Sequence, residues 1–210
     1  MNEDGDMAVT AITGDIGSGK STASHILCEL LGCGCLDADV LAKSLWLRPD
    51  VKARAVERWG AGVLGPDGGL VLPAVAGHIF SSQEEHEFCC RLIHPLVMAE
   101  LWERVQELGD VVVEVPLLPE AGRPEWVDAA VYVTAPFEVR VQRCSVRGWD
   151  SQELVKRERF LMPQSQRMAV CDVVVHNDGD MDSLRRQMED ALGPRAQRYI
   201  TKIQTYINDN

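Results

Sequence analysis

The chain has 210 residues, 46% of them hydrophobic, and a formal net charge of −11 at pH 7. This length suits one domain with a sizeable core. The acidic balance argues against a nucleic-acid polymer as partner, because such partners require a basic face. No apolar run approaches the length of a membrane span, and the acidic start Met1–Asp6 lacks the features of a signal peptide. We therefore expect a cytoplasmic protein with no membrane partner.

A strand, a glycine-rich loop and a helix open the chain. The apolar run Met7–Thr13 predicts a buried strand, and the apolar spacing over Thr22–Leu31 predicts an amphipathic helix. Between them lies the motif GDIGSGKS of residues 14–21, which is the full pattern G-x-x-x-x-G-K-S. Glycine-rich turns also join strands to helices without a ligand, but the complete pattern in this context predicts a nucleoside-triphosphate site.

Each part of this motif has a chemical role in such a site. The backbone amides of the loop would cradle the phosphates, Lys20 would reach the β- and γ-phosphates, and the Ser21 hydroxyl would bind Mg²⁺. The N-terminus of the following helix adds partial positive charge. The residues of the motif that we expect to bind ATP are Gly17, Ser18, Gly19, Lys20, Ser21 and Thr22.

Further along the chain, short β-branched runs alternate with helical patterns. The elements expected are a strand at Gly34–Asp39, helices at Val40–Leu47 and Val51–Trp59, a loop at Gly60–Gly69, a helical region at Leu72–Leu108 broken near His94–Pro95, strands at Val111–Pro116, Ala129–Thr134 and Cys171–His176, and a closing helix at Asp182–Leu192. Strands separated by helices predict an α/β fold, a parallel sheet flanked by helices on both faces. We expect a single domain over 1–193, with an inserted helical region at about 48–108 and a lid at about 140–169, followed by a polar tail at 194–210.

In such sheets, ligands bind outside the carboxyl ends of the strands. That rule places Asp37, Asp39 and Glu114 along the same edge as the glycine-rich loop. A carboxylate there could accept the proton of an acceptor hydroxyl, and Asp37 and Asp39 are the candidates. Alternation along a strand would point them to opposite faces, so that one of them meets the acceptor. Asp-x-Asp also suits an N-cap, and one carboxylate could cap the next helix while the other acts.

Residues 140–167 form a basic segment, with seven basic and three acidic side chains. Such a segment suits a small polyanion, although charge runs are commonly solvated helix faces. Arg143 and Arg147 are four residues apart, which would place both guanidinium groups on one helix face, ready to neutralise a transferred phosphoryl group.

The seven cysteines are odd in number and lack the spacing of a disulfide framework, so we expect reduced thiols. Cys33-Gly34-Cys35 could suggest a metal or redox pair. No second pair or nearby histidine completes it, and we expect no metal there.

Six motifs, taken in order, resemble one family. They are TGDIGSGKST, LDAD, IFSSQEE with LIHPLV, VVVEVPLLPE, RVQRCSVRG and MPQSQRMAVCDVVVHNDG. The motif of the glycine-rich loop alone occurs in hundreds of families. The ordered set of motifs, over roughly residues 8–192, resembles the dephospho-coenzyme A kinases, the last enzymes of coenzyme A synthesis.

The resemblance implies a P-loop kinase with a core, a lid over ATP and a helical acceptor-binding domain. It implies transfer of the ATP γ-phosphate, with Mg²⁺, to the 3′-hydroxyl of the adenosine ribose of dephospho-coenzyme A. The catalytic aspartate of the family matches Asp39, its lid arginines match Arg143 and Arg147, and its late asparagine matches Asn177. We therefore expect Asp39, Lys20, Arg143 and Arg147 to be catalytic, Asn177 to help bind the nucleotide, and the protein to be a monomer.

Some positions depart from the family's usual pattern. Asp15 stands where glycine is common and places a negative charge beside the phosphate loop. The other departures are Arg140 and Leu161 for glutamines near the lid, Ala76 and His78 for basic residues, and Pro119 for an aromatic residue before Glu120. His94 could serve the expected helix break or contact the acceptor.

Three other functions compete with this interpretation. One is a small P-loop kinase acting on a nucleoside monophosphate or another small metabolite. A GTPase-type switch would need an Asn-Lys-x-Asp motif, which the sequence lacks. The third is a paralogue that binds nucleotide without turnover, which the departures would allow.

Overall fold

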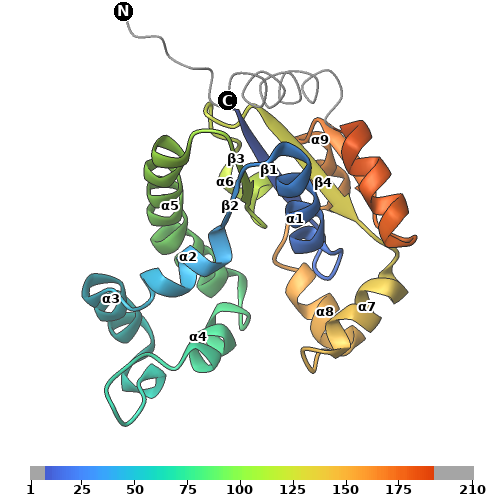
Figure 1. Ribbon diagram of the computed structural model, residues 1–210. Coiled ribbons are helices and arrows are strands. Elements are labelled where there is room, and N and C mark those ends of the chain that lie inside the picture. The colour runs from blue at the N-terminus through green and yellow to red at the C-terminus, as the bar shows by residue number, and fades with distance from the viewer. Residues whose placement is uncertain (1–7, 192–210) are drawn as a thin grey trace, which may run out of the picture.

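A five-stranded parallel sheet with helices on both faces forms the centre of the protein (Figure 1), as the sequence predicts. The computed structural model describes residues 8–191. The strands are β1 (Val9–Gly14), β2 (Gly34–Asp37), β3 (Val111–Glu114), β4 (Ala129–Thr134) and β5 (Val173–His176). Their order is β2-β3-β1-β4-β5, so the strand that precedes the glycine-rich loop lies in the middle of the sheet.

Several helices lie where the sequence predicts them, with shifted ends, and the structure adds short helices that the sequence did not predict. The helices are α1 (Lys20–Leu31), α2 (Ala38–Leu45), α3 (Pro49–Trp59), the short 3₁₀ helix η1 (Ala61–Val63), α4 (Leu72–Ile79), α5 (Gln83–Leu108), α6 (Leu118–Ala121), α7 (Phe137–Ser145), α8 (Ser151–Glu158) and α9 (Gln164–Ala169). Residues 181–191 are also helical. The expected polar tail, 194–210, lies outside the described residues.

Alternation along the strands divides the core into two parts. On β3, Val111 and Val113 pack in the cluster that includes α2, α3 and α5, whereas Val112 packs in the cluster of α1. Leu27 of α1 and Leu184 of the closing helix belong to that second cluster. Successive strand residues point to opposite faces, and both faces are covered, which explains why the central strands are mostly apolar rather than alternating between apolar and polar residues.

The expected helix break at His94–Pro95 is wrong. Helix α5 runs from Gln83 to Leu108 with Pro95 inside it, and the chain turns earlier, between α4 and α5. The Ser82 side chain accepts a hydrogen bond from the Glu85 backbone amide at 3.3 Å, and Glu84 and Glu85 lie in the first turn. Capping and favourable charge at the helix N-terminus therefore set the boundary here.

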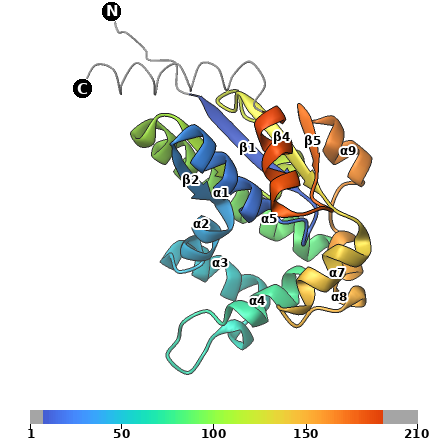
Figure 2. The same cartoon turned by 45° about the vertical axis from the view of Figure 1, so that its right-hand side comes forward.

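Two groups of helices extend beyond the carboxyl ends of the strands. Helices α3 and α4 lie on one side and α7 and α8 on the other, and α4 approaches α8 (Figures 1 and 2). The ring of Phe160, just after α8, lies 5.8 Å from the ring of Phe80 and 5.2 Å from that of His86. These aromatic contacts join the two groups.

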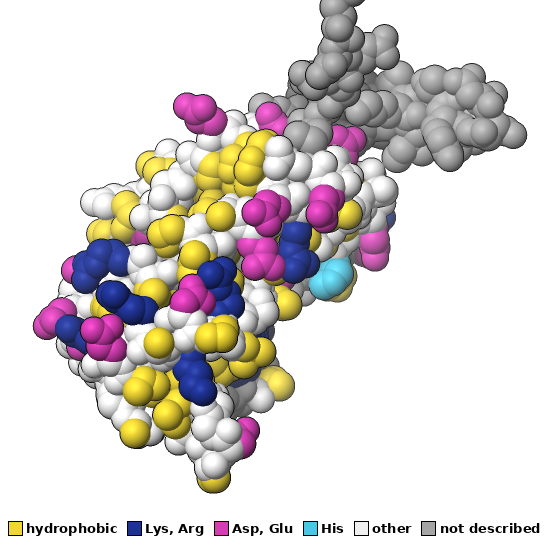
Figure 3. Space-filling model, turned by 90° about the vertical axis from the view of Figure 1, so that its left-hand side faces the viewer, with side chains coloured by type: hydrophobic (Ala, Val, Ile, Leu, Met, Phe, Trp, Pro, Cys, Tyr) yellow, Lys and Arg dark blue, Asp and Glu magenta, His cyan; other side chains and the backbone are white. Residues whose placement is uncertain are grey.

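The outer face of the protein near α3 and α5 is mixed in character. Basic and acidic side chains are interspersed there with scattered apolar groups, so this face has no continuous basic surface (Figure 3). Within residues 8–191, no helix is long and apolar enough to cross a membrane.

We predict that Leu27→Ala destabilises the fold by about 2–5 kcal/mol, because it leaves a cavity between α1 and the sheet. Leu47→Ala is the matched control, since Leu47 is 71% exposed and its truncation should change stability by less than about 0.5 kcal/mol. Urea unfolding would measure both. Equal shifts for the two variants would contradict the packing described here.

Candidate active site

The predicted site residues gather at the carboxyl edge of the sheet. β1 leads into the glycine-rich loop, β2 ends at Asp37, β3 ends at Glu114, and Asn177 follows β5 directly. All the strands are parallel, so these ends share one edge, as the sequence predicts.

Tight packing accounts for the glycines of the loop. Gly17 has φ +76°, and a Cβ there would lie 2.7 Å from the Cys144 sulfur. Gly19 has φ +91°, and a Cβ there would lie 2.4 Å from the Asn177 amide nitrogen. Both positions combine a left-handed backbone with close neighbours, so a side chain at either would displace the helices that pack on the loop.

Lys20 begins α1 and folds back over the loop. Its ammonium donates hydrogen bonds to the carbonyl oxygens of Asp15 at 3.0 Å and of Gly14 at 3.4 Å. Burial lowers the pKa of Lys20, while the charges of Glu114 and Asp39 oppose that shift. The structure therefore places the lysine cation between the loop and two carboxylates, where an incoming phosphate group could meet it.

The sequence places Glu114 at this edge of the sheet but assigns it no role. The structure shows which side chains it contacts. The Ser21 hydroxyl donates to one Glu114 carboxylate oxygen at 3.1 Å, and the Ser24 hydroxyl donates to the other at 3.4 Å. Glu114 is only 7% exposed, and burial raises its pKa. The sequence shows a carboxylate at the end of a buried strand, which indicates a residue at the site. It does not indicate the partners of this carboxylate, because Ser21 and Ser24 lie some ninety positions away in sequence.

The expectation that Asp39 ends a strand is wrong. β2 ends at Asp37, whose carboxylate accepts hydrogen bonds from the amides of Asp39 at 2.7 Å and Val40 at 3.3 Å. Asp37 is thus the N-cap of α2, and Asp39 lies in the first turn of that helix. Burial first, and then the charge of Asp37, raise the pKa of Asp39, and the charge of Lys20 opposes them. Of the two aspartates, Asp37 is therefore the one that caps the helix.

Arg143 and Asn177 both hold the glycine-rich loop from outside. The Arg143 guanidinium donates to the carbonyl of Ser18 at 3.0 Å and to the carbonyl of Asn177 at 3.0 Å. The Asn177 side-chain amide donates to the same Ser18 carbonyl at 2.8 Å.

The Ser18 hydroxyl is buried without a hydrogen-bond partner among the described residues. Thr22 lies in the first turn of α1.

Arg143 and Arg147 do not share a helix face, contrary to expectation. α7 ends at Ser145, and Arg147 lies in the turn after it, exposed, with its guanidinium 5.8 Å from the Trp149 ring centre. Its charge nevertheless acts on the active site, since it helps to lower the pKa values of Lys20 and Asp39. Arg147 therefore acts from the turn that follows α7, and not from a helix face shared with Arg143.

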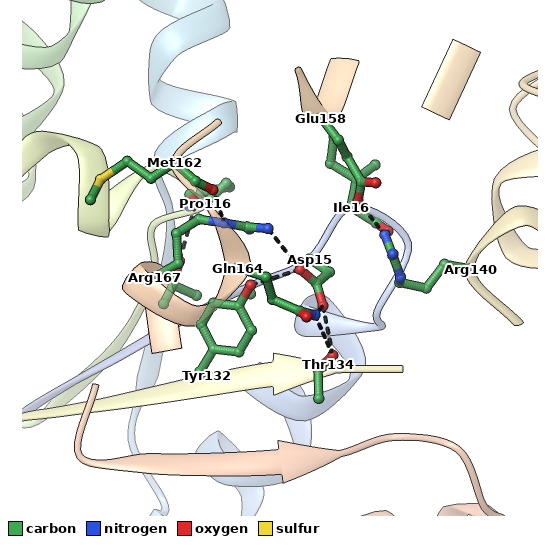
Figure 4. A network of polar contacts seen from close by, with 12 residues as sticks. Asp15, Ile16, Pro116, Tyr132, Thr134, Arg140, Glu158, Met162, Gln164 and Arg167 are labelled. Carbon is green, nitrogen blue, oxygen red and sulfur yellow. Dashed lines mark hydrogen bonds and ion pairs between the residues drawn. The ribbon is translucent and has the colours of Figure 1, made fainter. Parts of the chain in front are cut away.

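Asp15 places a negative charge beside the loop, as the sequence predicts, and this charge opposes the lowering of the Lys20 pKa. Its carboxylate is 1% exposed and points away from the loop interior, toward Tyr132, Thr134, Gln164 and Arg167 (Figure 4).

Arg140 is likewise buried. Its guanidinium donates to the carbonyls of Ala135 at 3.1 Å and Ile16 at 3.3 Å and pairs with Glu158. These two departures from the family pattern therefore hold α7, α8 and α9 against the loop.

The remaining departures lie away from the loop. The His78 ring stacks on Trp59 at 5.3 Å, Pro119 is buried at the start of α6, and Leu161 is half-buried after α8. Ala76 lies in α4. His94 lies inside the unbroken α5, where burial lowers its pKa, so a helix break is no longer a role for it.

Within the described part of the chain, no group of three or more His, Cys, Asp or Glu side chains could hold a metal ion by itself.

Comparisons with known proteins agree with this arrangement. A family model described as dephospho-CoA kinase matches residues 8–183. The dephospho-CoA kinase of Corynebacterium jeikeium is 35% identical over 195 residues, which cover 89% of this chain and 99% of that protein. The dephospho-CoA kinase of Carboxydothermus hydrogenoformans is 32% identical over 190 residues, covering 87% and 91%.

A solved structure supports the same relationship. The crystal structure of TT1252 from Thermus thermophilus matches with a TM-score of 0.73 and 32% identity, over 90% of this chain and 97% of that one. The family model covers most of the chain, and the relatives align over nearly their whole length. This chain therefore belongs to the dephospho-CoA kinase family.

Proposed function

We propose that this protein phosphorylates dephospho-coenzyme A with ATP, at the 3′-hydroxyl of the adenosine ribose, to give coenzyme A and ADP. The observation that carries the proposal is the meeting of Lys20, Ser21, Glu114 and Asp39 at one edge of the sheet, in a chain of this family. Phosphoryl transfer requires that the phosphates be held, their charge neutralised and the acceptor oxygen kept in line. These residues supply the groups for each requirement.

The glycine-rich loop and Lys20 would hold the nucleotide. In this proposal the amides of Gly17 and Gly19, with those at the start of α1, face the phosphates, and Lys20 turns from the loop carbonyls to the β- and γ-phosphates. Arg143 and Asn177 support the loop through the Ser18 carbonyl. Arg147 adds positive charge from the turn after α7.

Ser21 and Glu114 fit a magnesium ion bound together with the nucleotide. Mg²⁺ prefers oxygen ligands and is commonly held by few protein groups plus substrate phosphates. The Ser21 hydroxyl and the Glu114 carboxylate already lie in hydrogen-bond contact at the end of β3. Bound there, the ion would neutralise charge on the phosphates.

Asp39 is the proposed general base. A ribose hydroxyl is a poor nucleophile at neutral pH, and a nearby carboxylate would orient it and take its proton. The raised pKa of Asp39 makes it a stronger base than an ordinary aspartate. Asp37 is committed to two backbone amides and is unsuited to this role.

The division into a core, a helical acceptor region at about 48–108 and a lid at about 140–169 is part of this proposal. So are the monomeric state and the cytoplasmic location. The aromatic contacts of Phe160 with Phe80, before α5, and with His86, in the first turns of α5, support a lid that meets the acceptor region.

A coupled assay of ADP release, with and without dephospho-coenzyme A, tests the function directly. Acceptor-dependent release is the expected result. A panel of nucleoside monophosphates and small metabolites in the same assay tests the rival kinase activities. ATP binding with no turnover on any acceptor would instead support a paralogue that only binds nucleotide.

We predict that Lys20→Ala lowers kcat/KM by about 10²–10³-fold, because it removes a cation that stabilises charge on the transferred group. Arg186→Ala, at an exposed position in the closing helix, removes a positive charge away from the loop, the acceptor region and the lid, and it should leave kcat/KM within about two-fold, as expected for a distant surface change. Circular dichroism would confirm that both variants fold. Near wild-type activity in Lys20→Ala would contradict the phosphate assignment.

We predict that Asp39→Asn lowers kcat by about 10²–10⁴-fold, the usual contribution of a general base. ATP binding, measured by calorimetry, should change little. Asp37→Asn should retain more activity and show its effect mainly as a lower melting temperature, because the change weakens an N-cap. The reverse ranking of the two variants in kcat would show that the base is Asp37.

The same assignment predicts a pH dependence. The base must be ionised, and the pH dependence of kcat/KM reports the pKa values of the free enzyme, so kcat/KM of the wild type should fall as pH drops through the pKa of Asp39. Burial raises that pKa, so the acid limb should lie above the ordinary value of 3.8. This limb should disappear from the residual activity of Asp39→Asn. An unchanged limb in that variant would assign the titration to another group.

We predict that an ATP analogue that resists hydrolysis slows amide hydrogen exchange across residues 143–167, as expected for a lid that orders on binding. The decrease should be greatest between Arg147 and Phe160, because Arg167 is already tied to Asp15. Helix α5 serves as the internal reference. Identical exchange with and without the analogue would rule out a nucleotide-ordered lid.

A further inference from the structure

Asp15, the second residue of the glycine-rich loop, has a fully occupied side chain. Its carboxylate accepts hydrogen bonds from the Tyr132 hydroxyl at 2.7 Å, the Thr134 hydroxyl at 2.6 Å, the Gln164 amide at 2.7 Å and the Arg167 guanidinium at 2.9 Å (Figure 4). Two of these donors lie on β4 and two on α9. The loop is therefore bound through one side chain to two elements that are distant in sequence.

The donors are themselves held in place. Tyr132 and Thr134 are alternate residues of β4, so their side chains leave the strand on the same side. Arg167 is 4% exposed, and its guanidinium also donates to the Met162 carbonyl at 3.0 Å. Few other orientations are open to a carboxylate bound by four fixed donors.

Asp15 keeps its charge in this environment. Burial alone would raise its pKa, but the hydrogen bonds from Thr134, Tyr132 and Gln164 outweigh burial, so that the pKa of Asp15 is lowered. Arg167 supplies the opposite charge at 2.9 Å. Removing one member of a buried pair leaves the other uncompensated, which is strongly unfavourable.

The backbone of the same residue holds the active-site lysine. The Asp15 carbonyl accepts the Lys20 ammonium at 3.0 Å and the Ser18 amide at 3.2 Å, and the Asp15 amide donates to the Val133 carbonyl at 3.1 Å. Because the side chain is fixed by α9 and the amide by β4, the direction of this carbonyl is fixed as well. The long side chain of Lys20 thus has a defined acceptor beside the phosphate position.

We propose that Asp15 is a positioning residue: its carboxylate, bound by α9 and β4, fixes the peptide whose carbonyl holds Lys20 ready for the nucleotide. The inference rests on the proposed role of Lys20 in binding phosphate. It also explains how the phosphate loop tolerates an acidic residue, since the carboxylate is paired with Arg167 on the side away from the nucleotide.

Asp15→Asn tests this proposal. The variant keeps the size of the side chain but loses the charge, and it presents an amide group to donors. The KM for ATP should rise by about 10- to 100-fold, the effect expected when a group that contacts the reacting substrate is misplaced. The KM for dephospho-coenzyme A should stay within about two-fold, because no acceptor contact changes. Arg167→Gln should act in the same direction, and the double variant should be less than additive, since both changes break one pair.

Arg123→Gln is the matched control. It breaks an ion pair of the same length, between Arg123 and Asp172 at 2.9 Å, near the opposite edge of the sheet. It should lower the melting temperature without changing the KM for ATP. If Asp15→Asn does not fold, Thr134→Val removes one donor with little change in size and should raise the KM for ATP by a smaller factor.

The outcomes separate this inference from the function on which it rests. If Lys20→Ala is inactive but Asp15→Asn, like the control, changes only the melting temperature, Asp15 is structural and the inference is wrong. If Lys20→Ala itself keeps full activity, the assignment of Lys20 fails first. A rise in the KM for ATP in Asp15→Asn together with an inactive Lys20→Ala supports both.

Discussion

The site depends on how the carbonyl groups of the glycine-rich loop are held. A loop whose amides point inward to a phosphate must turn its carbonyls outward, where they need donors. The Ser18 carbonyl receives Arg143 and Asn177, the Ile16 carbonyl receives Arg140, and the Asp15 carbonyl receives Lys20. These donors come from α7, from the residue after β5 and from α1, so the sheet and the helices around it meet at this one loop.

Because the loop carbonyls need donors, the basic segment at 140–167 has a structural role that the sequence did not indicate. The sequence suggested a surplus of positive charge available to a polyanion. In the structure, Arg140 and Arg167 are buried and paired with Glu158 and Asp15. Arg157 lies over the rings of Phe80 and Trp149 at 4.4 and 3.9 Å. Much of the positive charge therefore stabilises the glycine-rich loop and the packing of α7, α8 and α9. The net charge of the segment overstated the positive charge that is available to a bound polyanion.

The sequence predicted the sheet and the residues at its edge well, because β-branched runs and the loop motif are local signals. It misplaced the break in the long helical region, although Ser82 and Glu85 have the spacing of a capping box, because Pro95 is the more familiar breaker. The sequence placed Glu114 at this edge, but the contacts of Glu114 and Asp15 could not be predicted, since their partners lie far away in sequence and only the folded chain brings them together.

The electrostatics of the cleft follow from the same geometry. Glu114 and Asp39 have raised pKa values and Lys20 has a lowered one, with burial the largest cause in each. Each group is thus desolvated and partly compensated by the others. A magnesium ion and the phosphates of a nucleotide would add one cation near the carboxylates and several anionic oxygens near the lysine, which favours the ionised form of all three. Binding of the substrate and ionisation of the base are therefore coupled.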